Sequence, residues 1–281
     1  MFQKEAIYTY LTRAKKETLI MGILNITPDS FSDGGKFHAL DAALARGLQM
    51  EKEGAHIIDV GGESTDALRP GHQPIGADEE LSRVIPVIER LSKEVNIPIS
   101  IDTYKADVAK AAIKAGASII NDIWGAKKDE NMGAVAAELQ VPIVLMHNRM
   151  MDTYQNFLPD LMKDLKESID IVKAKGVCDH QIILDPGIGF AKNFEQNVEV
   201  MKNLDQLCTF GYPVLLAVSK KRMIGTILDL PVEERTEGSV AAICFGVTKG
   251  VQMVRVHDVK ETKRALQIMD VLLGKRGLSD G

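Results

Sequence analysis

Residues 18–35 of the chain read TLIMGILNITPDSFSDGG, and this stretch contains the pattern that decides the fold. Its first half is almost entirely apolar, as expected of a strand buried on both faces of a parallel sheet. Polar and turn-forming residues take over from Asn25 and Thr27 onward. Ligands bind at the carboxyl ends of strands in open α/β sheets and in (β/α)8 barrels, so we interpret this loop as part of a binding site.

Seven further apolar runs of the same character follow, separated by segments of helical periodicity. Each run is short, rich in Ile and Val, and closed by a polar residue, which is typical of βα repeats. Eight strands alternating with helices, without a break in composition, favour a (β/α)8 TIM barrel over a doubly wound sheet and predict a single domain over residues 1–281. The predicted strands cover residues 19–26, 56–60, 97–101, 118–121, 142–147, 181–184, 212–218 and 253–256.

The segments between these runs have the spacing of amphipathic helices. Leu40, Leu44 and Leu48 recur every four residues, and a similar stripe predicts helices over 158–172, 193–208 and 261–273. Residues 274–281, rich in Gly and charge, are predicted to form a flexible tail. Four glycines between a helical stretch and a strand are predicted to end helices in the left-handed conformation, namely Gly54, Gly116, Gly176 and Gly211.

Composition and charge narrow the class of protein. The chain has 45% hydrophobic and 26% charged residues, as globular proteins do. Its formal net charge of −5 argues against a polyanion-binding surface, so we expect no nucleic-acid partner. No run approaches the roughly 20 apolar residues of a membrane helix, and no secretory signal is evident, so we expect a cytoplasmic protein without membrane contact. Cys178, Cys208 and Cys244 lack metal-type spacing and fit a reducing compartment.

Several familiar catalytic signatures are absent from the sequence. It contains no Walker A motif, no GxGxxG turn after a strand, no HExxH helix and no GxSxG elbow. Nucleotide hydrolysis, Rossmann-type hydride transfer, zincin chemistry and α/β-hydrolase chemistry therefore lose support.

Every predicted strand ends in a polar residue. A single such residue often caps a neighbouring helix or satisfies loop backbone. The opposite strand ends carry no comparable set, so together these residues predict a site at the carboxyl end of the barrel. They are Asn25; Asp59 with Glu63; Asp102; Asn121 with Asp122; His147 with Asn148; Asp185; Ser219 with Lys221; and Arg255 with His257.

The chemistry of these residues falls into two groups. Asp102, Asn121 and Asp185 are short acceptors and amides, suited to reading a nitrogen-rich ring. Arg255 and His257 alternate along the last strand and point to the same side, where they favour phosphate binding.

Asn25 and Lys221 extend this second group in a closed barrel. Barrels often place phosphate beside the last two strands. Asn25 is also a candidate magnesium ligand, because Mg²⁺ takes few protein oxygens and completes its shell with water and phosphate.

Six motifs resemble, in order and spacing, those of the dihydropteroate synthase family, and the match spans nearly the whole chain. The resemblance implies an enzyme of folate biosynthesis that joins 6-hydroxymethyl-7,8-dihydropterin diphosphate to p-aminobenzoate, releasing pyrophosphate and forming 7,8-dihydropteroate. The motifs are LNITPDSFSDGG at 24–35, DVGGEST at 59–65, ISIDT at 99–103, IINDI at 119–123, ILDPGIGF at 183–190 and VRVHDV at 254–259.

The resemblance also implies a role for individual residues. The family's pterin pocket matches Asp102, Asn121, Asp185 and Lys221, with Ile123, Met146 and Phe190 as apolar lining and Arg255 beside the ring. Its diphosphate and Mg²⁺ site matches Asn25, Thr65, Arg255 and His257. Phe31, Asp33, Arg69 and Pro70 match residues that close over p-aminobenzoate and pyrophosphate, and Ser219 is placed among the substrate-binding residues.

The mechanism that the resemblance implies is dissociative: pyrophosphate leaves first, a cation forms at the pterin methylene, and the arylamine attacks it. Ionised Asp102 and Asp185 would favour that cation, while the basic residues stabilise the departing diphosphate. We count Asp33, Asp102, Asp185, Lys221 and Arg255 as catalytic.

Two of the lining residues have a second interpretation. Ile123 and Met146 equally fit core packing, because barrel interiors are rich in apolar side chains. Phe190 stands in a glycine loop with little core to fill, which favours a planar ligand. His147 is given no catalytic role.

Two segments depart from the family pattern. Residues 219–222 read SKKR where the family typically has SRKS, which replaces a bidentate arginine by Lys220. Residues 66–68 look inserted in the second loop, and we expect them to lengthen the lid over p-aminobenzoate and to alter affinity for it and for sulfonamides. The family also implies a homodimer, formed here through helices at 234–248 and 261–273.

Two other functions share the ring-reading residues. A methyltransferase that uses methyltetrahydrofolate and a corrinoid partner should lack the loop at 27–35 and the pair Arg255 and His257. A non-catalytic pterin-binding paralogue should have lost Asn25, Lys221, Arg255 or His257, and none of these is lost.

Overall fold

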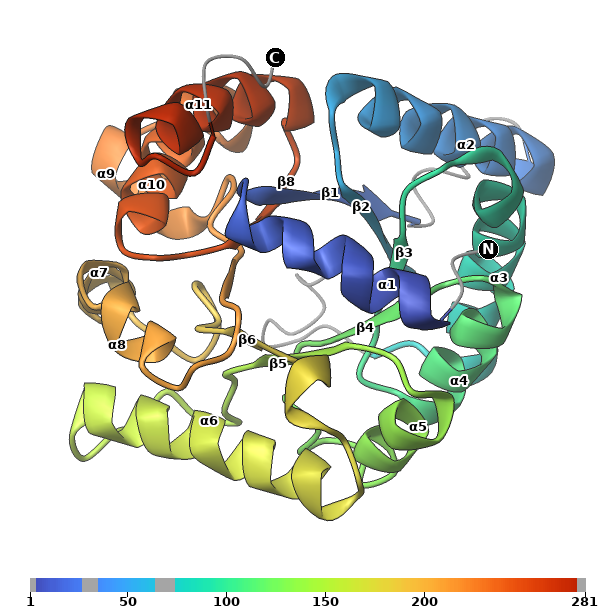
Figure 1. Cartoon of the computed structure of the whole chain (residues 1–281), viewed down its shortest axis with the longest axis horizontal. Helices are drawn as coiled ribbons and strands as arrows, with labels where there is room; N and C mark the ends of the chain where they lie inside the picture. Colours follow the sequence, from blue (N-terminus) through green and yellow to red (C-terminus); the bar gives the residue numbers. More distant parts are fainter. Residues whose placement is uncertain (1–3, 27–34, 64–73, 277–281) are drawn as a thin grey trace.

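The computed structural model describes residues 4–26, 35–63 and 74–276. Eight parallel strands run around a central ring and helices surround them (Figure 1). The strands are β1 Leu19–Asn25, β2 Ile57–Gly61, β3 Ile99–Asp102, β4 Ile119–Asp122, β5 Ile143–Met146, β6 Ile182–Asp185, β7 Leu215–Leu216 and β8 Met253–Val256.

The ring of strands is closed. Seven neighbouring pairs follow the order β6-β5-β4-β3-β2-β1-β8-β7. The remaining gap is spanned by a parallel bridge between Leu184 and Val214, where the Leu184 N–H donates to the Pro213 carbonyl at 2.9 Å. The predicted (β/α)8 TIM barrel is therefore confirmed, including the closure that periodicity alone leaves open.

The helices form the outer layer, and none of those described is long and apolar enough to cross a membrane. They are α1 Lys4–Leu11, α2 Gly35–Glu53, α3 Ala77–Glu94, α4 Ala106–Ala115, α5 Met132–Leu139, α6 Phe157–Ala174, α7 Phe194–Lys202, α8 Leu204–Cys208, α9 Arg222–Leu228, α10 Thr236–Thr248 and α11 Val259–Leu272, with short 3-10 turns at Thr12–Lys15, Asp179–Gln181 and Val232–Glu234.

Two predicted elements differ most in extent. The helix predicted over 193–208 is two helices, α7 and α8, which are separated at Asn203. Its φ of −117° lies outside the helical range, and its side-chain amide instead donates to the Glu199 carbonyl at 2.8 Å. The strand predicted over 212–218 is confined to β7, because Pro213 has no N–H for the ladder and Val218 already accepts from Lys221 in a turn. The four predicted helix-ending glycines have φ between 80° and 127°, as expected.

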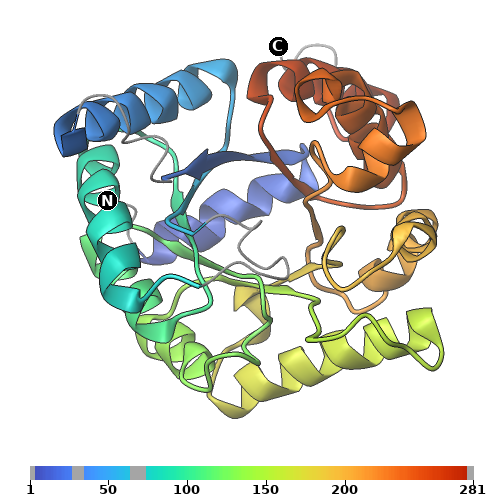
Figure 2. The same cartoon turned by 180° about the vertical axis from the view of Figure 1, so that it is seen from behind.

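The inward-facing side chains form two layers. The lower layer is entirely apolar and packs against Ile7 of α1, which crosses this end of the barrel (Figure 1) and lies behind the strands in the opposite view (Figure 2). Each fully buried aliphatic side chain contributes about 1.5–3 kcal/mol to folding. The strand residues of this layer are Leu19, Met21, Ile57, Ile119, Val144, Ile183, Leu215 and Met253.

The upper layer follows from strand alternation, since residues two positions apart face the same side. Two residues beyond Ile57, Ile119, Ile183 and Met253 stand Asp59, Asn121, Asp185 and Arg255. Ser100 and Asp102 of β3 share this face, because they pair in register with Asp59 and Asn121. The barrel is thus filled with hydrocarbon at one end and with polar groups at the other.

Candidate active site

Arg255 joins three strands at the centre of the upper layer. Its Nε–H donates to Asp59 Oδ2 and an Nη2 hydrogen to Asp102 Oδ2, both at 2.6 Å. The Asn121 amide also donates to Asp59 Oδ2, at 3.0 Å. All four side chains are buried, so the guanidinium holds acids from β2 and β3 in one network.

Asp59 is the member of this network that was given no individual role in the predicted site. It lies in the middle of β2 and begins the DVGGEST motif, and its place among the predicted polar strand ends was the available signal. Its Oδ1 is buried without a hydrogen-bond partner among the described residues. A buried acceptor without a hydrogen-bond partner lowers the stability of the fold. Its position next to Asn121 and Arg255 indicates that the upper layer can accept hydrogen bonds from a ligand.

Burial shifts two acids of this layer, Asp102 and Asp185, toward their neutral forms. It raises the pKa of Asp102 to about 7, against the attraction of Arg255. It also raises the pKa of Asp185 to about 6, although the Gly187 N–H and Lys221 stabilise the carboxylate. Asp185 Oδ1 accepts that Gly187 N–H at 2.7 Å. Asp102 and Asp185, the two acids predicted to bind the nitrogen-rich ring, therefore both change charge near neutral pH.

Lys221 and Phe190, two of the predicted pocket residues, lie in contact with each other. The Lys221 ammonium lies 4.4 Å from the centre of the Phe190 ring, a cation–π distance. Gly189, with φ of 84°, makes room for this contact, because a Cβ there would lie 3.3 Å from Lys221 Cδ. The structure thus brings the aromatic face of the glycine loop next to a cation.

Ser219 and His257 form a second pair beside this centre. The His257 backbone N–H donates to Ser219 Oγ at 3.2 Å, and Oγ lies 3.0 Å from Nδ1 of the same residue. A hydroxyl that accepts from the backbone donates to Nδ1, which leaves the hydrogen on Nε2. Burial and the neighbouring Arg255 lower the pKa of His257 to about 4. His257 is therefore neutral, and the charge of the predicted basic recess comes from Arg255 and Lys221.

Asn25 lies at the exposed end of β1. A Cβ on Gly61 would lie 3.5 Å from Asn25 Oδ1 and 3.6 Å from Asp102 Oδ2, so both oxygens border the space that this glycine leaves. Within the described ranges, no group of three or more His, Cys, Asp and Glu side chains is arranged to hold a metal.

The remaining predicted residues divide into two sets. Met146 is buried and pairs in register with Asp185, which places it in the upper layer, and Ile123 is buried directly after β4. The others lie outside the described residues, as does the apparent insertion at 66–68. They are Phe31, Asp33, Thr65, Arg69 and Pro70.

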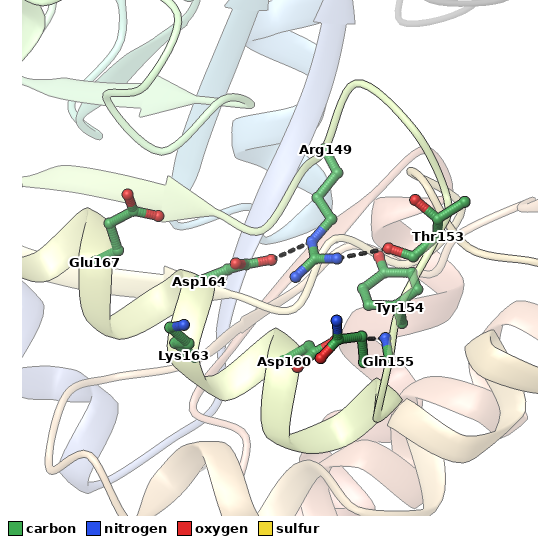
Figure 3. A pocket seen from close by; sticks show the side chains of 8 residues that line it. All are labelled: Arg149, Thr153, Tyr154, Gln155, Asp160, Lys163, Asp164 and Glu167. Atoms are coloured by element: carbon green, nitrogen blue, oxygen red, sulfur yellow. Dashed lines mark hydrogen bonds and ion pairs between the residues drawn. The ribbon is translucent and has the colours of Figure 1, made fainter.

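A separate surface pocket of about 740 Å³ lies over α6 and the segment before it. Figure 3 shows Arg149 between Asp164 and the main chain of Thr153, with the Tyr154 ring beside it. Its lining includes none of the predicted site residues. The site predicted at the strand ends and this pocket are therefore different places on the barrel.

The chain matches the family described as pterin binding enzyme over residues 21–257. The dihydropteroate synthase of Bacillus subtilis is 59% identical over 267 residues, which cover 95% of this chain and 93% of that protein. A dihydropteroate synthase structure from Clostridium difficile, solved in the presence of pteroic acid, has a TM-score of 0.88 and 48% identity, covering 92% of this chain and 97% of that one. A Xanthomonas albilineans dihydropteroate synthase with 4-aminobenzoic acid gives 0.87 and 40%, with 92% and 94% covered. Over this length and identity, the chain belongs to the pterin-binding enzymes and is a member of the dihydropteroate synthase family.

Proposed function

We propose that the polar upper layer is where 6-hydroxymethyl-7,8-dihydropterin diphosphate condenses with p-aminobenzoate to give 7,8-dihydropteroate and pyrophosphate. The observation that carries this proposal is the buried network in which Arg255 bridges Asp59 and Asp102 next to Asn121. A barrel gains no stability from so many buried polar groups, so their use lies in binding.

Asp102, Asp185 and Asn121 form hydrogen bonds to the edge of the pterin ring in this proposal. A dihydropterin presents an exocyclic amine and ring N–H groups, which are donors that match the carboxylates of Asp185 and Asp102. The Asn121 side chain offers both a donor and an acceptor. Ring donors that reach Asp185 stabilise its ionised form and so offset the burial that raises its pKa.

Phe190 and Lys221 lie beside the position proposed for the pterin ring. An aromatic face is a good surface for a flat heterocycle. The Lys221 ammonium, which is already over Phe190, then stands near the ring edge and the methylene that reacts. Met146 adds apolar surface from β5.

Bond breaking places negative charge on the departing diphosphate. The C–O bond at the methylene breaks with its electron pair going to pyrophosphate. The arylamine lone pair then forms the C–N bond, and the nitrogen releases its proton to water. Arg255, Lys221 and the Nε2–H of His257 are the donors that stabilise the leaving group. Ionised Asp102 and Asp185 stabilise positive charge on the pterin, so the two kinds of residue act on opposite ends of the breaking bond.

Mg²⁺ is the proposed cofactor, and Asn25 Oδ1 is the protein oxygen that would hold it. A site with one protein ligand suits this ion, which keeps several waters and binds substrate phosphates. The exposure of Asn25 at the end of β1 leaves room for them. When bound, the ion supplies charge neutralisation to the diphosphate.

Residues of the two loops beyond β1 and β2 complete the proposal. Phe31, Asp33, Arg69 and Pro70 would close over p-aminobenzoate and pyrophosphate, and Thr65 would contact the diphosphate. Loops that close over a reaction exclude water from it.

We also propose that the protein works as a homodimer in the cytoplasm. Large apolar side chains are exposed on α9 to α11, which lie together on one side of the barrel (Figure 1), and such patches are typical of interfaces. Phe245 and Ile268 are 43% and 63% exposed. The three cysteines are free thiols, as in a reducing compartment.

Incubation of the purified protein with the pterin diphosphate and p-aminobenzoate, with detection of pyrophosphate and dihydropteroate, tests the proposed reaction. Equal formation of both products supports it. Pterin binding without turnover indicates a non-catalytic paralogue, and methyl transfer from methyltetrahydrofolate to a corrinoid protein indicates the methyltransferase. Either result would contradict the proposal.

A further inference from the structure

The loop between β6 and α7 is clamped by a lysine that the reaction does not otherwise use. Lys192 Nζ lies 2.8 Å from His147 Nδ1 and 3.0 Å from each of the Gly187 and Phe190 carbonyl oxygens. One side chain therefore ties together two points of this loop and the residue that follows β5. Lys192 is half-buried.

The backbone of this loop explains why it needs such a clamp. Gly187, Gly189 and Ala191 all have positive φ, at 68°, 84° and 44°, so the segment has no regular ladder of hydrogen bonds. A Cβ on Gly187 would lie only 2.0 Å from the His147 carbonyl oxygen. The loop is thus pressed against the end of β5, and its inward-turned carbonyls require donors.

The position of the Lys192 side chain is fixed in turn by His147 and Asp164. His147 Nε2 lies 2.9 Å from Asp164 Oδ2, and Asp164 in turn accepts from Arg149 at the surface pocket (Figure 3). Burial lowers the pKa of His147 to about 4, so the ring is neutral. Its Nδ1 then accepts from Lys192 while the Nε2–H donates to Asp164. A chain of contacts runs from α6 to the glycine loop.

The loop that Lys192 holds carries two parts of the proposed pterin pocket. Phe190 presents its ring to Lys221, and the Gly187 N–H donates to the Asp185 carboxylate. Lys192 binds the carbonyl groups of these same two residues. A shift of the loop would therefore move the ring surface and the acid together.

We propose that Lys192, oriented by His147 and Asp164, is a positioning residue for the condensation. It holds Phe190 and Gly187 in place, so that the pterin ring lies at hydrogen-bond distance from Asp185. This inference rests on the proposed function of the upper layer. It assigns Lys192 a larger effect on the pterin ring than on the diphosphate, because the loop carries Phe190 and contacts Asp185, whereas Arg255 is held by Asp59 and Asp102 from other strands.

Lys192→Met tests this inference, since it keeps the aliphatic stem and removes the donors. We expect the Kd for 6-hydroxymethylpterin and the KM for the pterin diphosphate to rise about 10- to 100-fold, because the three hydrogen bonds that hold the loop are lost. The Kd for inorganic pyrophosphate should change much less, within about twofold, because Arg255 keeps its partners Asp59 and Asp102. Calorimetry with each compound and steady-state kinetics give these values.

Lys166→Met is the matched control, because Lys166 is an exposed lysine of α6 that is paired with Asp170, and its Kd and KM values should equal those of the wild type. His147→Leu provides a second route if Lys192→Met does not fold. It removes one of the three acceptors, so we expect the same selective loss, about threefold. In the double variant the two losses should not add.

The outcomes separate this inference from the proposed function. If the wild type neither binds 6-hydroxymethylpterin nor releases pyrophosphate, the proposed function fails and the inference fails with it. If the wild type does both, and folded Lys192→Met keeps its pterin affinity or loses pterin and pyrophosphate affinity equally, only the role of Lys192 is overturned.

Discussion

The two ends of the barrel interior are built from the same strands and do opposite work. On β6, Ile183 packs in the apolar lower layer and Asp185, two residues later, enters the polar upper layer. The lower layer is closed by α1 and stabilises the fold through burial. The upper layer buries acids whose pKa values are raised, as for Asp102 and Asp185. Residues two positions apart on one strand therefore serve fold stability in the lower layer and substrate chemistry in the upper layer.

The upper layer is electrostatically incomplete without a ligand. Asp59, Asp102 and Asp185 share Arg255 and the nearby Lys221, and Asp59 Oδ1 and Ser100 Oγ are buried without a hydrogen-bond partner among the described residues. Such groups cost stability unless they are satisfied. Substrate binding should thus change the upper layer most and the lower layer least.

The largest effect is expected from Arg255→Met. It leaves Asp59 and Asp102 as buried acids without their cation, which should destabilise the protein by about 3–5 kcal/mol. It should also reduce kcat/KM at least about 10²- to 10³-fold, because a donor to the leaving group is lost. Urea unfolding and pyrophosphate release measure both. Arg90→Met, at an exposed position of α3, is the control and should change neither; equal effects in the two variants would refute the role of Arg255.

A pair of substitutions on β1 contrasts the two layers directly. Leu19 is fully buried below and Asn25 is exposed above. Leu19→Ala should destabilise the protein by about 2–5 kcal/mol through cavity formation and leave both KM values unchanged. Asn25→Ala should leave the unfolding free energy within about 0.5 kcal/mol and weaken pyrophosphate binding in the presence of Mg²⁺. The comparison breaks down if Leu19→Ala changes the pterin KM in the folded enzyme.

Asp185→Asn should weaken binding of 6-hydroxymethylpterin about 10- to 100-fold, because a charge-assisted hydrogen bond is lost without a change of shape. The unfolding free energy of the unliganded protein should not fall, since the variant removes a buried carboxylate whose ionised form is disfavoured. Calorimetric titration and urea unfolding test the two halves of this prediction. Unchanged pterin affinity would remove Asp185 from the site.

The same carboxylate predicts opposite effects of pH on binding and on stability. The pKa of Asp185 is raised to about 6 in the fold, so its contribution to stability is present below the unfolded pKa and is lost as pH rises through about 6. Pterin affinity should instead rise, by about fivefold from pH 5 to pH 6, because the ionised acid accepts from the ring.

The comparison of wild type with Asp185→Asn isolates this group. His147 and His257 have lowered pKa values, and their contributions to stability are lost as pH falls from about 6.5 to about 4 in both proteins. Only the wild type should show the rise in pterin affinity between pH 5 and 6. A parallel rise in the variant would assign the pH dependence to another group.

Sequence reasoning found the strands because each is a continuous apolar run, and it found Asp185 and Asn121 because they end such runs. It missed the role of Asp59, whose partner Arg255 is 196 residues away in the chain and meets it only through barrel closure. The Lys192 clamp depends on positive φ at Ala191, a conformation that this residue type does not predict. The pattern of residues therefore gave no information on long-range pairing or on loop geometry.

The most direct test of the two-layer account is a crystal structure of the protein with 6-hydroxymethylpterin bound. We expect the ring in the upper layer, with its donors at hydrogen-bond distance from Asp185 and Asp102 and its plane against Phe190, while the lower layer is unchanged. A ring found instead in the surface pocket beside Arg149 and Tyr154, with the strand ends empty, would contradict the account.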